Sequence, residues 1–97
     1  MSKFVLTSKA KSDLKSIAKY TSKNWGRTQR NKYLSVMNST FCDLADDVLI
    51  GQRYFNILNK YYKYQIGKHI IFYHRIDKNM IEIVRILHEK MDIQSHL

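Results

Sequence analysis

Residues 61–87, YYKYQIGKHIIFYHRIDKNMIEIVRIL, decide the fold of this 97-residue chain. The stretch contains three runs rich in Ile, Phe, Tyr and Val, separated by the short polar breaks GK and DKN: 61–66, 69–75 and 80–87. β-Branched and aromatic residues between turn residues are typical of strands. Because strands joined by tight turns run antiparallel, the stretch predicts three successive antiparallel strands.

The last of these runs, 80–87, is apolar on both faces of the expected strand. Strict alternation assigns its side chains to two sets, with Ile81, Ile83 and Leu87 on one face and Val84 and Ile86 on the other. Two apolar faces are typical of a strand that is covered on both sides. We therefore expect this strand to be central in the sheet.

The first half of the chain follows a helical period. Mostly apolar residues recur there at steps of three and four along two segments: Ala10, Leu14, Ile17, Ala18, Thr21 and Trp25, then Leu34, Met37, Phe41, Leu44 and Val48. This spacing puts each set on one face of a helix. Between the segments, Gly26 suits the left-handed position that commonly follows a helix. Two amphipathic helices with so short a join predict an antiparallel hairpin.

A short apolar run at 3–6 precedes the first helix, and a loop is expected at 46–54, where Gly51 is the breaker. The elements then follow in the order strand, helix, helix and three strands. That order predicts an α+β fold: a short N-terminal strand, an antiparallel two-helix hairpin, and a mainly antiparallel sheet of three further strands. The length fits one domain, which we expect to span residues 1–97.

The chain is strongly basic, with 17 Lys and Arg against 8 Asp and Glu and a net charge of +9. The excess is spread over both halves and includes four lysines at four-residue steps on one helix face: Lys11, Lys15, Lys19 and Lys23. This lysine stripe has two readings, a solvated helix face or a contact with DNA or an acidic partner. Charge alone does not choose between them.

Composition excludes several classes of protein. The hydrophobic content of 44% provides for a core and argues against a disordered chain. No stretch approaches the roughly 20 apolar residues of a membrane-spanning helix, and the start MSKFVLTSKAKSD has no apolar centre of a signal peptide. The single cysteine, Cys42, excludes an internal disulfide. We expect a soluble, cytoplasmic protein.

The end of the chain carries the most specific sequence pattern. Its first motif, G-x-H-x-I-F-Y, is formed by Gly67, His69, Ile71, Phe72 and Tyr73. Its second motif, R-I-L-H-x-x-M-D, is formed by Arg85, Ile86, Leu87, His88, Met91 and Asp92. The opening LTSKAKSDLKSIAKYTSKNWG at 6–26 adds Ala, Asp-Leu, Ile, Tyr and Trp-Gly landmarks. In these motifs the chain resembles the ParE toxins of the RelE/ParE superfamily over nearly its full length.

The resemblance implies a toxin of a type II toxin–antitoxin pair, a class of systems that acts in plasmid or chromosome stability. It implies inhibition of DNA gyrase, in which cleaved DNA is stabilised and replication is blocked. It also implies a ParD-type antitoxin whose flexible C-terminal segment wraps the toxin, and hence a hetero-oligomer. No cofactor is expected.

The RelE-like branch of the superfamily, which cuts messenger RNA in the ribosome, supplies the alternative function. Such cleavage needs groups that transfer protons and stabilise phosphate charge, and the local candidates are Tyr73, His74, Arg85 and His88. Tyr73 and His74 are adjacent on a strand, so they point to opposite faces. Arg85 and His88 are three apart and alternate in the same way. We therefore expect no catalytic site and no enzyme activity.

The histidines do not indicate a metal site. Their spacing matches no metal-ligand motif, and no pair of carboxylates lies beside them in the sequence: His69, His74, His88 and His96. With three glycines in the chain, a phosphate-binding glycine loop is not expected either.

Two sets of residues are candidates for contacts with partner proteins. A small domain cannot bury every aromatic side chain, which makes the following residues antitoxin-binding candidates: Trp25, Tyr54, Phe55, Tyr61, Tyr62 and Tyr64. The end of the chain, basic and partly apolar, supplies the gyrase-binding candidates: Arg85, His88, Lys90 and Met91.

Two of these candidates also have a purely structural reading. Trp25 would then cap the core of the helical hairpin. Arg85, which is costly in an apolar strand unless it is paired, would form a strut with Glu82 or Asp92.

Overall fold

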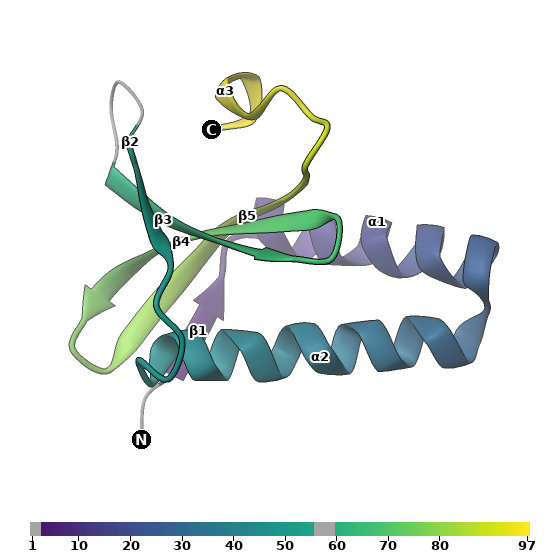
Figure 1. The fold of residues 1–97 in the computed structure, drawn as a ribbon, viewed down its shortest axis with the longest axis horizontal. Helices are drawn as coiled ribbons and strands as arrows, with labels where there is room; N and C mark the ends of the chain where they lie inside the picture. Colours follow the sequence, from purple (N-terminus) through teal and green to yellow (C-terminus); the bar gives the residue numbers. More distant parts are fainter. Residues whose placement is uncertain (1–2, 56–59) are drawn as a thin grey trace.

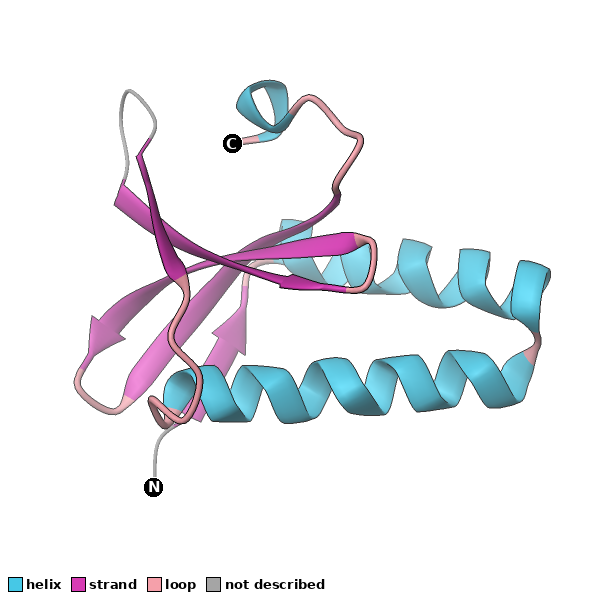
Figure 2. Cartoon of the chain, in the orientation of Figure 1, coloured by secondary structure: helices cyan, strands magenta, loops and turns pink. Residues whose placement is uncertain are grey.

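A five-stranded sheet and a hairpin of two long helices make up most of the structure, a computed structural model that describes residues 3–55 and 60–97. The elements follow one another in this order (Figure 1, Figure 2): β1 Lys3–Leu6, α1 Ser8–Trp25, α2 Arg27–Ala45, β2 Gln52–Phe55, β3 Lys60–Ile66, β4 His69–Asp77, β5 Met80–His88 and α3 Ile93–His96. This order confirms the expected α+β fold, with one strand more than predicted.

The strands lie side by side in the order β1-β5-β4-β3-β2, with β1 parallel to β5 and all other neighbours antiparallel. β5 therefore lies inside the sheet, as its two apolar faces predict. The additional strand, β2, begins within the segment 46–54, so the prediction of a loop there is wrong at its C-terminal end. The sequence QRYF is short and half polar, and it becomes a strand by pairing with β3, where Tyr54 lies opposite Tyr61.

The two long helices cover one face of the sheet, and the C-terminal segment with α3 passes over the other face (Figure 1). The helices form the predicted antiparallel hairpin, joined by Gly26 in a left-handed conformation with a φ of 91°. Their apolar stripes meet the sheet in a core whose fully buried large side chains include Met37, Phe41, Leu44, Ile71, Ile81 and Ile83.

A β-bulge at Val84 changes which face of β5 each side chain occupies. Arg85 pairs with Phe72 and Ile83 pairs with Tyr73, which leaves Val84 without a partner in the ladder. An extra residue in one strand shifts the alternation by one position. Ile86 therefore joins the helix-facing core, and Leu87 turns to the opposite face. The sets predicted by strict alternation are wrong for these two residues.

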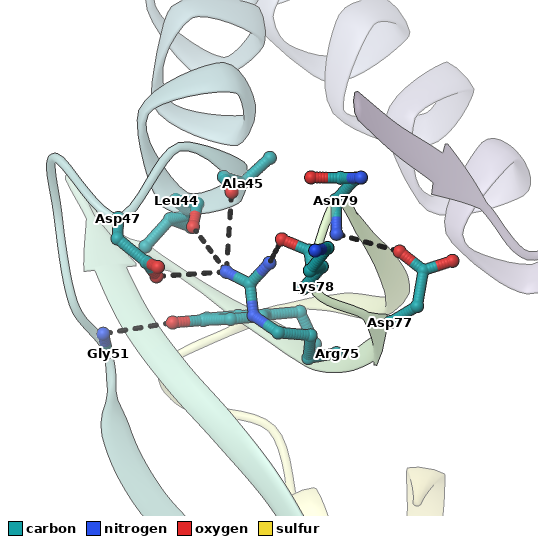
Figure 3. Close-up of polar contacts among 9 residues, drawn as sticks. Leu44, Ala45, Asp47, Gly51, Arg75, Asp77, Lys78 and Asn79 are labelled. Atoms are coloured by element: carbon teal, nitrogen blue, oxygen red, sulfur yellow. Dashed lines mark hydrogen bonds and ion pairs between the residues drawn. The ribbon is translucent and has the colours of Figure 1, made fainter. Parts of the chain in front are cut away.

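Arg75 fixes the end of α2 to the sheet (Figure 3). Its Nη2 donates to the carbonyls of Leu44 and Ala45 at 3.4 and 3.3 Å and to the Asp47 carboxylate at 2.9 Å. Its Nη1 donates to the Lys78 carbonyl at 3.3 Å. The last carbonyls of a helix lack partners within the helix and favour a cation. Arg75 thus joins α2 to the turn between β4 and β5.

Candidate functional site

Arg85 forms the most buried ion pair among the described residues, and its partner is Asp13 of α1. Its Nε and Nη2 donate to the two carboxylate oxygens of Asp13 at 2.8 and 2.9 Å, with the side chains 16% and 13% exposed. These hydrogen bonds raise the pKa of Arg85, against a smaller opposing effect of burial. Asp13 also accepts the backbone N–H of Ile86 at 2.9 Å.

The predicted partners of Arg85, Glu82 and Asp92, are therefore wrong. Glu82 instead contacts His74 at 2.8 Å, and Asp92 accepts a hydrogen bond from Ser95 at 2.7 Å. The reason lies in the sheet, because β1 stops at Leu6 and leaves the following edge of β5 open. The carboxylate of Asp13 occupies this edge, which the guanidinium of Arg85 also reaches.

The four candidate acid–base residues lie in four different surroundings. Tyr73 is buried in the helix-facing core, and this burial raises the pKa of its hydroxyl. The hydroxyl accepts a hydrogen bond from the Gly51 N–H at 2.9 Å (Figure 3). His74 lies on the other face against Glu82, as the alternation predicts. Arg85 is held by Asp13, and His88 lies on the helix-facing side, opposite His69.

Gly51 is required where the chain enters β2. A side-chain carbon at this position would lie 2.7 Å from the Tyr73 hydroxyl and 2.8 Å from the Lys63 carbonyl. Such distances are far inside van der Waals contact, so only glycine lets the backbone approach the sheet here. The sequence marks Gly51 as a breaker, but its close approach to Tyr73 appears only in the fold.

A cluster of Tyr33, His69 and His88 joins α2 to the start of β4 and the end of β5, and sequence reasoning missed it. The Tyr33 hydroxyl lies 3.1 Å from the Ile66 carbonyl and 2.8 Å from His69 Nδ1, within hydrogen-bond distance of both. His88 Nδ1 accepts the Lys90 N–H at 3.1 Å, and the two imidazole rings are 5.5 Å apart. The three residues come from distant parts of the sequence, which explains why no local motif reveals them.

The electrostatics of this cluster act mainly on His69. Burial lowers the pKa of His69, the nearby His88 lowers it further, and Glu89 partly opposes both effects. Burial also raises the pKa of the Tyr33 hydroxyl. The described residues contain no group of three or more His, Cys, Asp or Glu side chains placed to hold a metal ion.

The gyrase-binding candidates are divided between a buried strand and an exposed turn. Lys90 is exposed and Met91 is 46% exposed after the end of β5, whereas His88 is half-buried and Arg85 is largely buried. The segment that follows folds back over the sheet (Figure 1), where Arg85 Nη1 donates to the His96 carbonyl at 3.1 Å. Phe72 and Leu87, on this face, are fully buried.

The antitoxin-binding candidates do not form one continuous surface. Trp25 is 71% exposed at the tip of the hairpin, so the reading of Trp25 as a cap over the hairpin core is wrong. Alternation along β3 and its pairing with β2 divide the tyrosines: Tyr54 and Tyr61 lie on the face of Phe72 and His74, and Tyr62 and Tyr64 pack against the helix-facing core. The side chain of Phe55 lies outside the described residues.

An apolar groove opens between the hairpin and β1. It has a volume of about 350 Å³ and is lined mainly by Phe4, Leu6, Leu14, Leu34, Met37 and Phe41. The groove is apolar because Phe4, Leu6, Leu14 and Leu34, on β1 and the two long helices, are only partly buried. Among the described helices, none is long and apolar enough to span a membrane.

The fold and the sequence both match known proteins. A family model described as the ParE toxin of the type II toxin–antitoxin system, parDE, matches residues 4–93. Toxin ParE1 of Caulobacter vibrioides is 32% identical over 97 residues, which cover 100% of this chain and 99% of that protein. Toxin ParE1 of Mycobacterium tuberculosis is 30% identical over 96 residues, covering 99% and 98% of the two chains.

A solved structure described as the chromosomal ParDE toxin–antitoxin system from P. aeruginosa has the same fold. It superposes with a TM-score of 0.68 at 20% identity, covering 91% of this chain and 95% of that chain. The match to the family model extends over almost the whole sequence and includes the strands, the hairpin and the motif at the end of β5. The chain belongs to the ParE toxin family of type II toxin–antitoxin systems.

Proposed function

We propose that this ParE-family toxin inhibits DNA gyrase, stabilises cleaved DNA and so blocks DNA replication. The observation that carries the proposal is the match to ParE toxins over residues 4–93, together with relatives of the same length. The protein acts in this proposal by binding, without chemistry of its own.

The placement of the acid–base residues supports a binding protein over an RNA-cleaving enzyme. A nuclease needs its proton-transferring and charge-stabilising groups around one phosphate. Here Tyr73 is in the core, His74 and His88 lie on opposite faces of the sheet, and Arg85 is occupied by Asp13. These four side chains have no common point at which a phosphate would meet them.

The proposed gyrase contact lies at the end of β5 and in the segment after it. Lys90 and Met91 provide a cation and an apolar side chain at an exposed turn. His88 lies at the base of this turn and accepts the Lys90 N–H. Arg85 contributes indirectly, because it holds the following segment through the His96 carbonyl.

We also propose a ParD-type antitoxin as the partner that neutralises the toxin in a hetero-oligomer. The P. aeruginosa structure with the same fold is described as a ParDE system. In this chain the apolar groove offers a site for the apolar side chains of an antitoxin segment, a known mode of peptide binding. The net charge of +9 favours an acidic segment. The exposed Trp25 and the half-buried Tyr61 on β3 remain separate candidates for further contacts.

Pulse labelling in cells separates gyrase inhibition from the RelE-like alternative. The toxin is expressed from an inducible promoter, and thymidine and methionine incorporation are followed separately. A gyrase inhibitor stops thymidine incorporation first, and co-expression of the antitoxin restores it. If methionine incorporation stops first, with cuts in ribosome-bound messenger RNA that His88→Ala abolishes, the proposal is wrong and the alternative applies.

A further inference from the structure

The distal part of the helical hairpin carries an unusual distribution of charge. Residues 14–42, named here the arm, contain no Asp or Glu and six cations: Lys15, Lys19, Lys23, Arg27, Arg30 and Lys32. The arm therefore holds +6 of the net charge of +9. Arg27 and Arg30 lie in and beside the first turn of α2, where the helix dipole favours acidic residues. This placement raises the positive potential at the tip at the expense of helix stability.

The cations of the arm have no acidic partners within the described residues. The ion pairs there join Lys68 to Glu89, His74 to Glu82, Arg75 to Asp47 and Arg85 to Asp13, all outside the arm. Lysine-rich helices usually place Glu one turn away, which neutralises the face. The arm lacks such residues, so a strong positive field surrounds it.

The lysines of α1 face away from the core. Lys15, Lys19 and Lys23 are exposed on the side opposite the buried Ala10 and Ile17. Four-residue steps advance about 6 Å each, so these lysines span about 12 Å. The arm projects past the sheet (Figure 1), which leaves this side of the hairpin open to a large ligand.

We propose that the lysine side of the arm binds the phosphate backbone of duplex DNA. Over about 12 Å of its axis, duplex DNA presents about seven negative charges, so each of the three lysines that α1 places along this length can meet a phosphate. Ser16 lies between Lys15 and Lys19 and Ser12 lies one turn before Ser16, both exposed, and hydroxyls of this kind also donate to phosphates. Tyr20 and Trp25, exposed at 65% and 71% near these lysines, could also serve an acidic protein partner, which the experiment below therefore tests as the competing ligand.

The width of the arm determines how it meets the duplex. Each helix is about 10 Å across, and the major groove is about 12 Å wide, so two helices side by side do not enter it. The lysines therefore contact backbone phosphates without reading bases, and binding is independent of sequence. This inference does not depend on gyrase inhibition, because it concerns DNA alone. In addition to the proposed contact with gyrase, it gives the toxin a contact of its own with the DNA that gyrase holds.

Trp25 provides a built-in reporter of this interaction. It is the only tryptophan of the chain and is 71% exposed at the tip, between Lys23 and Arg27 in the sequence. DNA lying along the arm changes the surroundings of the indole, so its fluorescence should change during a titration with duplex.

The experiment measures binding of a labelled 20-base-pair duplex by fluorescence anisotropy and by Trp25 emission. We expect a Kd in the micromolar range at low salt, equal for two unrelated sequences. Contact with all six cations predicts a slope of log K against log salt of about −5. The variant K15Q/K19Q/K23Q should reduce that slope to about −3 and weaken binding by about tenfold or more.

The matched control is K3Q/K60Q/K78Q, which removes the same charge from exposed lysines on the strands and the β4–β5 turn. It should retain most of the affinity, and circular dichroism verifies that both variants fold. Equal loss in the control would show an effect of net charge alone and overturn the proposal. So would equally tight binding to poly-glutamate or to single-stranded RNA of the same charge, since either would identify a different class of ligand.

Discussion

At the scale of single residues, Asp13 and Arg85 join α1 to β5 across 72 positions of sequence. Arg85 is visible in the sequence as a charge in an apolar strand, but its partner is not, because Asp13 reaches β5 only where β1 has ended. The pair holds the start of the hairpin, the open edge of β5 and, through the His96 carbonyl, the C-terminal segment. One carboxylate therefore supports three parts of the fold.

Asp13→Asn should lower the free energy of unfolding by about 2–4 kcal/mol, because it leaves the guanidinium of Arg85 largely buried without a counter-charge. Urea denaturation followed by circular dichroism measures the change. Glu82→Gln is the matched control, since the His74–Glu82 pair is more than one third exposed and should cost below about 1 kcal/mol. Equal costs for the two variants would contradict the role assigned to Asp13.

His69 should make the stability of the protein depend on pH. Burial and the nearby His88 hold its pKa below the ordinary value of about 6.5, so the folded state binds fewer protons than the unfolded state. The contribution of neutral His69 to the free energy of unfolding is complete above about pH 6.5, and it is lost as the pH falls through the folded-state pKa.

The variant His69→Asn, which keeps a polar amide at this position but does not titrate, should flatten the fall in unfolding free energy between about pH 7.5 and pH 5. The exposed His96→Asn serves as the control and should leave the fall unchanged. An unchanged pH dependence in His69→Asn would show that His69 is not the responsible group.

At the scale of elements, the sequence predicts the parts whose pattern is local. The helices follow from their period and β3 to β5 from their composition and turns. β2 was missed because QRYF becomes a strand only by pairing with β3. The bulge at Val84 was missed because nothing in an alternating strand marks an extra residue, yet it decides the faces of Ile86 and Leu87. The candidate site depends on contacts between residues distant in sequence, such as Asp13 with Arg85, and these contacts are not visible in a local pattern.

The C-terminal segment is the element to which we assign the effect on gyrase. Truncation after Glu89 removes Lys90, Met91 and the segment that passes over the face of Phe72 and Leu87, but it leaves the helix-facing core intact. The truncated protein should fold with lower stability, bind antitoxin and fail to trap gyrase on cleaved DNA. Circular dichroism and a gyrase cleavage assay test these expectations.

A second variant keeps this prediction testable if the truncated chain does not fold. In the full-length chain, Lys90→Ala combined with Met91→Ala changes only exposed side chains and should also weaken the trapping of gyrase. Lys78→Ala, on the exposed turn between β4 and β5, should not. If either folded variant still poisons gyrase at the unmodified level, the segment is not the effector, and the arm becomes the next candidate.

At the scale of the whole molecule, the helical hairpin and the C-terminal segment lie on opposite faces of one sheet (Figure 1). The apolar groove lies under the hairpin, the C-terminal segment lies on the opposite face, and the positive arm projects from the side. Large apolar side chains are also exposed: Trp25 at 71%, Val48 at 70% and Ile50 at 76%. The groove, the C-terminal segment and the arm are therefore three separate surfaces at which partners could bind.

The antitoxin should stabilise the toxin through the apolar groove. A partner that binds only the folded state adds about 4 kcal/mol at a thousandfold excess over Kd, so the melting temperature should rise clearly. Ala18→Arg, which places a long side chain in the groove, should reduce this rise. Ser16→Arg, on the exposed side of the same helix, should preserve it. A rise that is equal in both folded variants would place the antitoxin elsewhere.

Gyrase-dependent DNA cleavage tests the central claim most directly. Purified gyrase, supercoiled plasmid and ATP are incubated with the toxin, the reaction is stopped with detergent and protease, and linear plasmid is quantified. We predict that linear DNA accumulates in proportion to the toxin and disappears when the antitoxin is added in equimolar amount. Folded toxin that leaves supercoiling unaffected and yields no linear DNA, while it cuts messenger RNA on translating ribosomes, would contradict the claim.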